Sequence, residues 1–122
     1  MEFQDYQRDS TETAGGYANP FPNDIPEEQK AMFLALAING EAGELAEKVK
    51  KGVREGQTVD SQNFEADNYF REAEDEIGDI LWYMAQLATL LDVWMDTLAE
   101  RNLDKLQDRD ERDKIFGDGD NR

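Results

Sequence analysis

Four carboxylates in two short motifs are the residues of this chain best suited to chemistry. Glu41 and Glu44 form one pair, and Glu76 and Asp79 form the other. A spacing of three residues puts both side chains of a pair on one face of an α-helix. Two such helices packed antiparallel would gather these four residues, called here the motif carboxylates, around divalent ions. The pattern therefore predicts a metal site that acts on phosphate groups.

The elements that must position these motifs are all helical, because no stretch of the chain shows strand periodicity. We expect one domain over residues 1–122, with a loop at Ala14–Pro26 and an irregular tail at residues 107–122. Gly52 and Gly56 are predicted to mark the end of the second helix, and Asp92 to cap the fourth. The expected helices span residues 3–13, residues 27–54, a segment starting between Phe64 and Phe70 and ending near Leu91, and Val93 to about Leu106.

Each motif lies on a stripe of its helix that is otherwise apolar. The stripe of the first motif includes Phe33 toward the N-terminus, and the stripe of the second includes Tyr83 and Leu87 toward the C-terminus. The polar line of the second motif helix lies elsewhere, near Asp75, Gln86 and Thr89. An isolated acidic pair on a helix is usually a solvated face, but burying carboxylates without a counter-charge is costly. The alignment therefore favours metal binding, and a second apolar line on each helix indicates that the monomer is not the working unit.

Basic residues follow the first motif at helical spacing. Lys48 and Lys51 come seven residues after Glu41 and Glu44 respectively, a rise of about 10 Å along the helix, which matches the reach of a triphosphate. Metal ions at the glutamates, with Lys48, Lys51 or Arg54 beyond them, would form a track for a polyphosphate. The alternative is ordinary helix support by ion pairs four residues apart, such as Glu44–Lys48.

Composition excludes several classes of function. The chain has 29 acidic and 13 basic residues, no histidine and no cysteine, and a formal net charge of −16. This charge argues against binding to nucleic-acid backbones and to anionic membranes. Without cysteine or histidine, a thiol nucleophile and the usual zinc sites are excluded, so oxygen ligands for magnesium, manganese or calcium remain. We expect a cytoplasmic protein, in the host cytoplasm if a phage encodes it.

The sequence around the motifs resembles the MazG-like, all-α nucleoside triphosphate pyrophosphohydrolases, in particular their short single-domain members from bacteriophages and bacteria. The first motif lies in Asn-Gly-Glu-Ala-Gly-Glu, and the second in Glu-Ile-Gly-Asp-Ile-Leu-Trp-Tyr. The resemblance extends to residues 102–109 and to the Gly-Asp-Gly-Asp-Asn-Arg ending, so it covers nearly the whole chain.

The resemblance implies a four-helix arrangement completed by oligomerisation, as a homodimer or a homotetramer that is a dimer of dimers. It implies a Mg²⁺-dependent enzyme, with Mn²⁺ as a substitute, that hydrolyses (deoxy)nucleoside triphosphates between the α and β phosphates, with dGTP or GTP favoured. The motif carboxylates would be the metal ligands and catalytic residues. The candidate substrate-binding residues are Lys48, Lys51, Arg54, Asn102, Lys105 and Arg109. The last three lie on one stripe of the fourth helix, and the alternative for them is a solvated face plus a cap.

A rival interpretation is a non-catalytic acidic helical protein that acts as a regulator or nucleic-acid mimic and binds a basic partner. The charge of −16 fits this interpretation. It does not explain why the motif carboxylates align with apolar residues, nor why lysines stand above them on the same helix.

Overall fold

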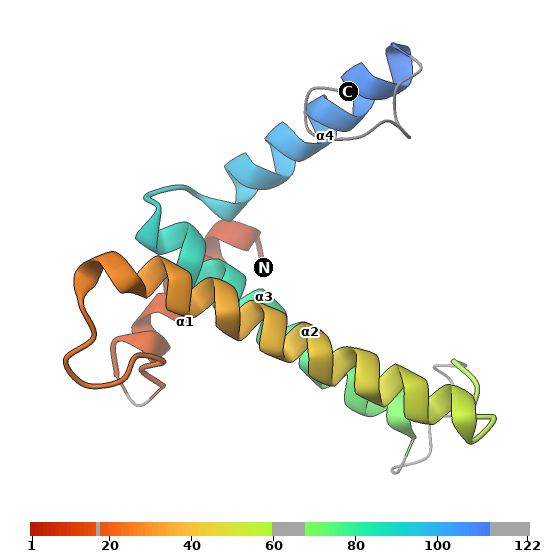
Figure 1. The fold of residues 1–122 in the computed structure, drawn as a ribbon. Helices are drawn as coiled ribbons and strands as arrows, with labels where there is room; N and C mark the ends of the chain where they lie inside the picture. The colour runs from red at the N-terminus through yellow and green to blue at the C-terminus, as the bar shows by residue number, and fades with distance from the viewer. Residues whose placement is uncertain (17, 60–67, 113–122) are drawn as a thin grey trace.

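Four α-helices make up the fold of this computed structural model, which describes residues 1–16, 18–59 and 68–112. No strand occurs in those ranges, so the predicted all-α class is confirmed. None of the helices there is long and apolar enough to cross a membrane. In chain order the helices are α1 (Phe3–Ala14), α2 (Lys30–Arg54), α3 (Tyr69–Leu90) and α4 (Met95–Glu111), with a 3-10 turn at Glu27–Gln29 before α2 (Figure 1).

Helices α2 and α3 lie side by side, antiparallel, and make the largest contact in the molecule (Figure 1). Asn68 fixes the start of α3, because its side chain accepts a hydrogen bond from the backbone N–H of Phe70. The Phe70 ring packs against Gly52, where an added Cβ would lie 2.8 Å from a ring carbon. The prediction that Gly52 marks the end of α2 was wrong, because this glycine is an internal residue that lets α3 approach closely. The helix ends at Arg54, and Gly56 takes the left-handed conformation with φ +67°.

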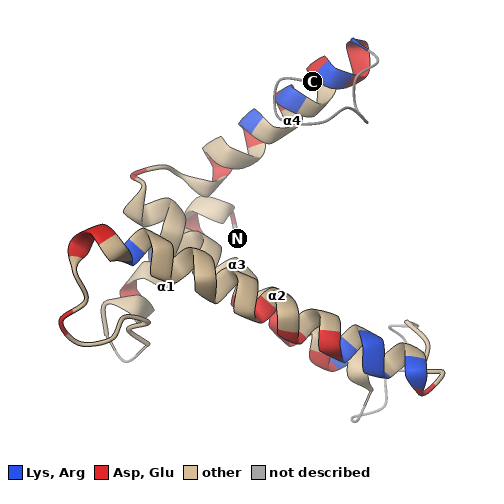
Figure 2. Cartoon of the chain, in the orientation of Figure 1, with Lys and Arg blue, Asp and Glu red and all other residues tan. Residues whose placement is uncertain are grey.

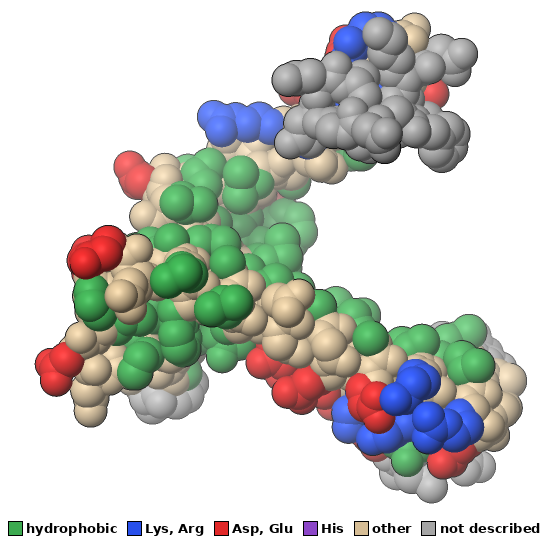
Figure 3. Space-filling view, in the orientation of Figure 1, with side chains coloured by type: hydrophobic (Ala, Val, Ile, Leu, Met, Phe, Trp, Pro, Cys, Tyr) green, Lys and Arg blue, Asp and Glu red, His purple; other side chains and the backbone are tan. Residues whose placement is uncertain are grey.

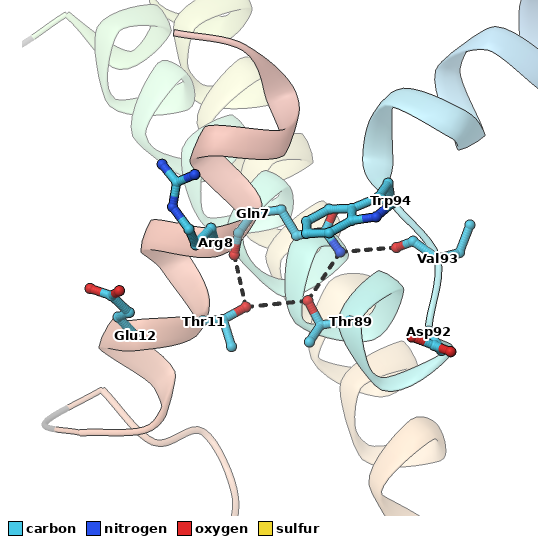
Figure 4. A pocket seen from close by; sticks show the side chains of 8 residues that line it. All are labelled: Gln7, Arg8, Thr11, Glu12, Thr89, Asp92, Val93 and Trp94. Atoms are coloured by element: carbon cyan, nitrogen blue, oxygen red, sulfur yellow. Dashed lines mark hydrogen bonds between the residues drawn. The ribbon is translucent and has the colours of Figure 1, made fainter.

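One buried amide of α1 makes three hydrogen bonds to the α3–α4 corner (Figure 4). The Gln7 side-chain nitrogen donates to Thr89 Oγ1 at 3.1 Å and to the Val93 carbonyl at 2.9 Å. Its oxygen accepts from the backbone N–H of Met95 at 2.7 Å. Asp92 has a left-handed φ of +54° and does not cap α4, so that prediction was wrong. A tertiary contact from α1 satisfies the first N–H of α4 instead.

This packing of α1 also covers the end of α3 that we expected to be polar and solvated. Gln86 is buried, with 6% of its surface exposed, and its amide donates to the Trp82 carbonyl. Trp82 in turn donates its indole N–H to Thr13 Oγ1 of α1 at 3.1 Å. The C-terminal part of this polar line therefore faces α1: Thr89 bonds to Gln7 and Thr11 of α1, whereas Gln86 bonds within α3.

Helix α4 packs mainly on α1 and extends away from the α2–α3 pair (Figure 1). It begins two residues later than predicted, at Met95, and continues past the predicted end near Leu106 to Glu111. The last turns are supported by side-chain pairs four residues apart, Gln107 with Glu111 and Asp108 with Arg112. The remainder of the predicted irregular tail, residues 113–122, lies outside the described residues.

The core of the single chain is small. Leu34 is the only large side chain in the described ranges with less than 2% of its surface exposed. Many large apolar side chains face solvent instead, including Leu36, Val53 and Leu103, each about two-thirds exposed. Figure 3 shows apolar side chains over much of the visible face around α1 and the first half of α2. This distribution is typical of a subunit that is completed by a partner.

Candidate metal and phosphate site

The antiparallel pairing of α2 and α3 brings most of the motif carboxylates together. Glu41, Glu44 and Glu76 each offer one oxygen, and these oxygens lie within 4.8 Å of one another. Asp79 is outside that three-glutamate cluster but close enough to act electrostatically on Glu41. In Figure 2 acidic residues, coloured red, occur along the middle of the two paired helices.

The carboxylates repel one another. Partial burial raises the pKa of Glu41 above its ordinary value, and the charges of Glu44, Asp79 and Glu76 raise it further. Within the described residues, the ion pairs of this region go to Glu47 and Glu72 rather than to the motif carboxylates. The cluster is therefore a concentration of negative charge that no ion pair neutralises directly, and a divalent cation would relieve the repulsion.

The donor set fits magnesium or manganese. All the donors are carboxylate oxygens, the ligand type that hard divalent cations prefer. The oxygens of the three-glutamate cluster lie within 4.8 Å of one another, so side-chain movements that bring them closer would let one ion contact all three glutamates. Asp79 lies outside this cluster and acts electrostatically on Glu41.

A lysine lies at one end of the cluster. Lys48 Nζ donates to Glu72 Oε2 across the helix pair at 2.6 Å. This hydrogen bond raises the pKa of Lys48, and the charges of Glu72, Glu76 and Glu44 add to the effect. The ion pair Glu44–Lys48 within α2, which we considered as an alternative, is not formed, because the ammonium group bonds to α3 instead.

The basic track continues along α2. Lys51 Nζ stands 3.6 Å from Glu47 Oε1 and 5.9 Å from the centre of the Tyr69 ring. Arg54 is exposed at the end of the helix. Figures 2 and 3 show the change from acidic to basic side chains toward this end. Lys51 thus forms one of the in-helix pairs of the alternative interpretation, yet remains beside the predicted track.

The three residues predicted on α4 do not join this site in a single chain. Asn102 and Lys105 are exposed, whereas Arg109 is buried with 3% of its surface exposed. The helix that carries them packs mainly on α1 and points away from α2 and α3 (Figure 1). Their predicted substrate contacts would have to be made across a subunit interface.

Two tyrosines at the other end of the cluster are absent from the predicted site. The pKa of Tyr83 is raised by burial and by the charges of Glu41 and Asp79. The pKa of Tyr6 is raised by burial and by the charge of Asp79. Tyr83 follows Asp79 by four residues, so helical spacing could have identified it. Tyr6 reaches the site through the packing of α1 on α3, which no local pattern encodes.

Two cavities that the described residues form lie away from the motif carboxylates. The first, of about 340 Å³, lies between α1 and the α3–α4 corner, with Gln7, Thr89 and Trp94 among its lining residues (Figure 4). A second, of about 220 Å³, is lined partly by Pro20 and Phe21 of the loop before α2. No motif carboxylate lines either cavity.

Comparison with known proteins agrees with this geometry. The family model for the MazG nucleotide pyrophosphohydrolase domain matches residues 29–113, which include α2, α3 and α4. The chain is 40% identical to the Gene 37 protein of Mycobacterium phage L5 over 122 residues, which is the full length of both proteins. No solved structure shows a significant match. The helices, the motifs and the family match together establish that this chain belongs to the MazG nucleotide pyrophosphohydrolase family.

Proposed function

We propose that this protein hydrolyses nucleoside triphosphates between the α and β phosphates, with Mg²⁺ as cofactor and a monophosphate and pyrophosphate as products. The observation that supports this proposal most is the three-glutamate cluster, in which carboxylate oxygens from two helices approach within 4.8 Å. Lys48 beside it adds the cation that a polyphosphate needs. Family membership supports the reaction class.

The chemistry assigns a role to each group. Bound Mg²⁺ would neutralise phosphate oxygens and lower the pKa of a coordinated water. The motif carboxylates would hold the ions, and one of the glutamates would take a proton from the attacking water. The water oxygen would bond to the α-phosphorus as the bond from that phosphorus to the bridging oxygen breaks, and pyrophosphate would leave with the electron pair. Lys48, Lys51 and Arg54 hold the β and γ phosphates and stabilise the leaving group.

The charges along the helix pair give the substrate a direction. Lys48 interacts with Glu72 and Glu76 at one end of the cluster. At the other end, the charges of Glu41 and Asp79 raise the pKa of Tyr83. These charges support an orientation in which the phosphates would extend toward the C-terminal end of α2 and the nucleoside would lie toward Tyr83. Ribo- and deoxynucleoside triphosphates, with dGTP or GTP first, are the proposed substrates.

We propose that the working unit is a homodimer or a dimer of dimers. The exposed apolar side chains of α2, α3 and α4 supply the surface for association. Asn102, Lys105 and Arg109 are carried on a helix that extends away from the cluster of its own chain. In the oligomer, α4 of one copy would bring them to the cluster of another.

The test is an HPLC assay of purified protein with all eight common ribo- and deoxynucleoside triphosphates, in Mg²⁺ and in EDTA. We expect monophosphate to form only with the metal, and dGTP or GTP to rank first. Absence of turnover in both Mg²⁺ and Mn²⁺ would contradict the proposal and would favour an acidic binding protein.

Variants then test the site. Glu44→Gln and Asp79→Asn should each abolish metal-dependent turnover and leave the helical circular dichroism spectrum unchanged. Glu74→Gln is the matched control, because Glu74 is an exposed carboxylate on a different face of α3. Retained activity in either motif variant would contradict a shared metal site.

A further inference from the structure

Lys48 forms its ion pair with a residue of another helix rather than with the expected partner on its own helix. Glu44 precedes Lys48 by four residues on α2, which is the favourable order for an ion pair within a helix. Lys48 nevertheless bonds across to Glu72 of α3, with 2.6 Å between Nζ and Oε2. No ion pair of Glu44 or Glu76 occurs within the described residues.

The location of this ion pair affects metal binding, because a lysine and a metal ion would compete for the carboxylate of Glu44. An ammonium group on Glu44 would occupy an oxygen that belongs to the three-glutamate cluster, and its charge would repel an incoming divalent cation. Glu72 is not a member of that cluster, yet it lies four residues before Glu76 and beside the same site. It is also not among the four motif residues.

We propose that Glu72 is a positioning residue that holds Lys48 away from Glu44, leaving Glu44 free to bind a metal ion. The inference rests on the proposed function, which makes Glu44 a metal ligand and Lys48 a phosphate ligand. An ammonium group has three N–H donors. Glu72 takes one of them, so two remain for the β or γ phosphate at the end of the cluster.

The Lys48–Glu72 ion pair is partly exposed to solvent, so both side chains can change their contacts when a ligand binds. The Lys48 side chain is 27% exposed and that of Glu72 is 40% exposed. Replacing Glu72 with glutamine removes the charge that attracts the ammonium group, and Lys48 then falls back on Glu44, its ordinary partner in α2. Loss of Glu72 thus makes Lys48 a competitor of the metal.

The experiment measures binding of Mn²⁺ alone, by isothermal titration calorimetry and electron paramagnetic resonance. The four proteins are the wild type, Lys48→Met, Glu72→Gln and the double variant. Glu72→Gln should weaken Mn²⁺ binding several-fold. The gain in Mn²⁺ affinity caused by Lys48→Met should be about fivefold or more larger in the Glu72→Gln background than in the wild-type background.

Equal gains from Lys48→Met in the two backgrounds would overturn the inference, because Glu72 would then contribute only its charge. The matched control is the pair Lys30–Glu27, whose lysine is 28% exposed and whose Nζ–Oε2 distance is 2.7 Å. Lys30→Met and Glu27→Gln should leave Mn²⁺ affinity unchanged. Circular dichroism of every variant verifies that the helices remain.

A kinetic measurement separates this inference from the proposed function. Glu72→Gln should raise the Mg²⁺ concentration needed for half-maximal turnover by a larger factor than it lowers kcat, and added Mg²⁺ should recover most of the rate. A loss of kcat that excess Mg²⁺ does not restore would overturn the positioning role. Absence of turnover in the wild type would contradict the proposed function, whereas the Mn²⁺ comparison would still decide the role of Glu72.

Discussion

At the scale of single residues, Glu41 lies in an electrostatically unfavourable position. It is partly buried and surrounded by like charges, so its pKa is raised in the folded chain. A carboxyl group with a raised pKa binds its proton more tightly in the folded state than in the unfolded state. Its contribution to stability therefore falls as the pH rises through the raised pKa.

Glu41→Gln should accordingly raise the melting temperature of the metal-free protein at pH 7 to 8. The gain should shrink as the pH falls through the raised pKa, because the wild-type Glu41 is then protonated. Thermal denaturation in EDTA at several pH values checks this. A lower melting temperature for the variant at pH 8 would contradict the electrostatic account, and added Mg²⁺ should stabilise the wild type more than the variant.

Tyr83 tests the direction of the substrate. Tyr83→Ala should raise the KM for the nucleoside triphosphate, because it removes the side chain toward which we propose that the nucleoside lies. The affinity for Mg²⁺-pyrophosphate should stay within about twofold, since the lysine end of the site is untouched. Competition assays with pyrophosphate measure the second quantity. Equal losses for both ligands would contradict the proposed direction.

At the scale of elements, Gly52 sets how closely α2 and α3 can pack. Gly52→Ala would place a Cβ 2.8 Å from the Phe70 ring. Overpacking of this kind costs about 1–3 kcal/mol, which exceeds the ~1 kcal/mol that alanine gains over glycine in a helix. We expect a net loss of about 1 kcal/mol in urea denaturation.

Gly43→Ala is the control for that substitution, because a Cβ at Gly43 meets nothing within 4 Å. It should stabilise α2 by up to about 1 kcal/mol through helix propensity alone. If the two variants change stability by the same amount, the close approach of Phe70 is not what requires glycine at position 52.

The helices illustrate what local sequence can predict. Hydrophobic periodicity and helix start and stop signals predicted the bounds of α1, α2 and α3 to within a few residues, because local sequence largely determines where long amphipathic helices form. The start of α4 was missed, since Gln7, far away in the chain, satisfies the N–H of Met95. The burial of Gln86 was missed for the same reason, because α1 converts a polar line into a contact surface.

The candidate site likewise has features that local sequence predicts and features that depend on tertiary packing. Spacing on each helix and antiparallel packing suffice to bring three of the motif carboxylates together. The partner of Lys48 could not be read from the sequence, because the in-helix pair with Glu44 and the pair with Glu72 of α3 differ only in tertiary geometry. Tyr6 is another residue that only the packing of α1 could reveal.

At the scale of the whole molecule, the exposed apolar side chains predict self-association. Size-exclusion chromatography with light scattering should show a dimer or tetramer at micromolar concentration. A monomer at those concentrations would contradict the proposal that α4 completes the site of another copy.

Mixing two inactive variants tests whether α4 of one copy completes the site of another copy. If sites are shared between copies, a heterodimer of Glu44→Gln and Lys105→Met subunits contains one intact site. Co-expression of the two should restore about a quarter of the wild-type activity with random pairing in a two-fold dimer. The control pair is Glu44→Gln with Asp79→Asn, which should restore nothing because both residues serve the same copy's cluster. No recovery with the first pair would show that α4 acts elsewhere.

The most direct test of the central claim is ³¹P NMR of the purified protein with Mg²⁺ and dGTP in ¹⁸O-labelled water. The account predicts monophosphate and pyrophosphate, with the label in the monophosphate, because water attacks the α-phosphorus. Diphosphate with orthophosphate, label in the pyrophosphate, or no turnover of any nucleoside triphosphate would contradict it.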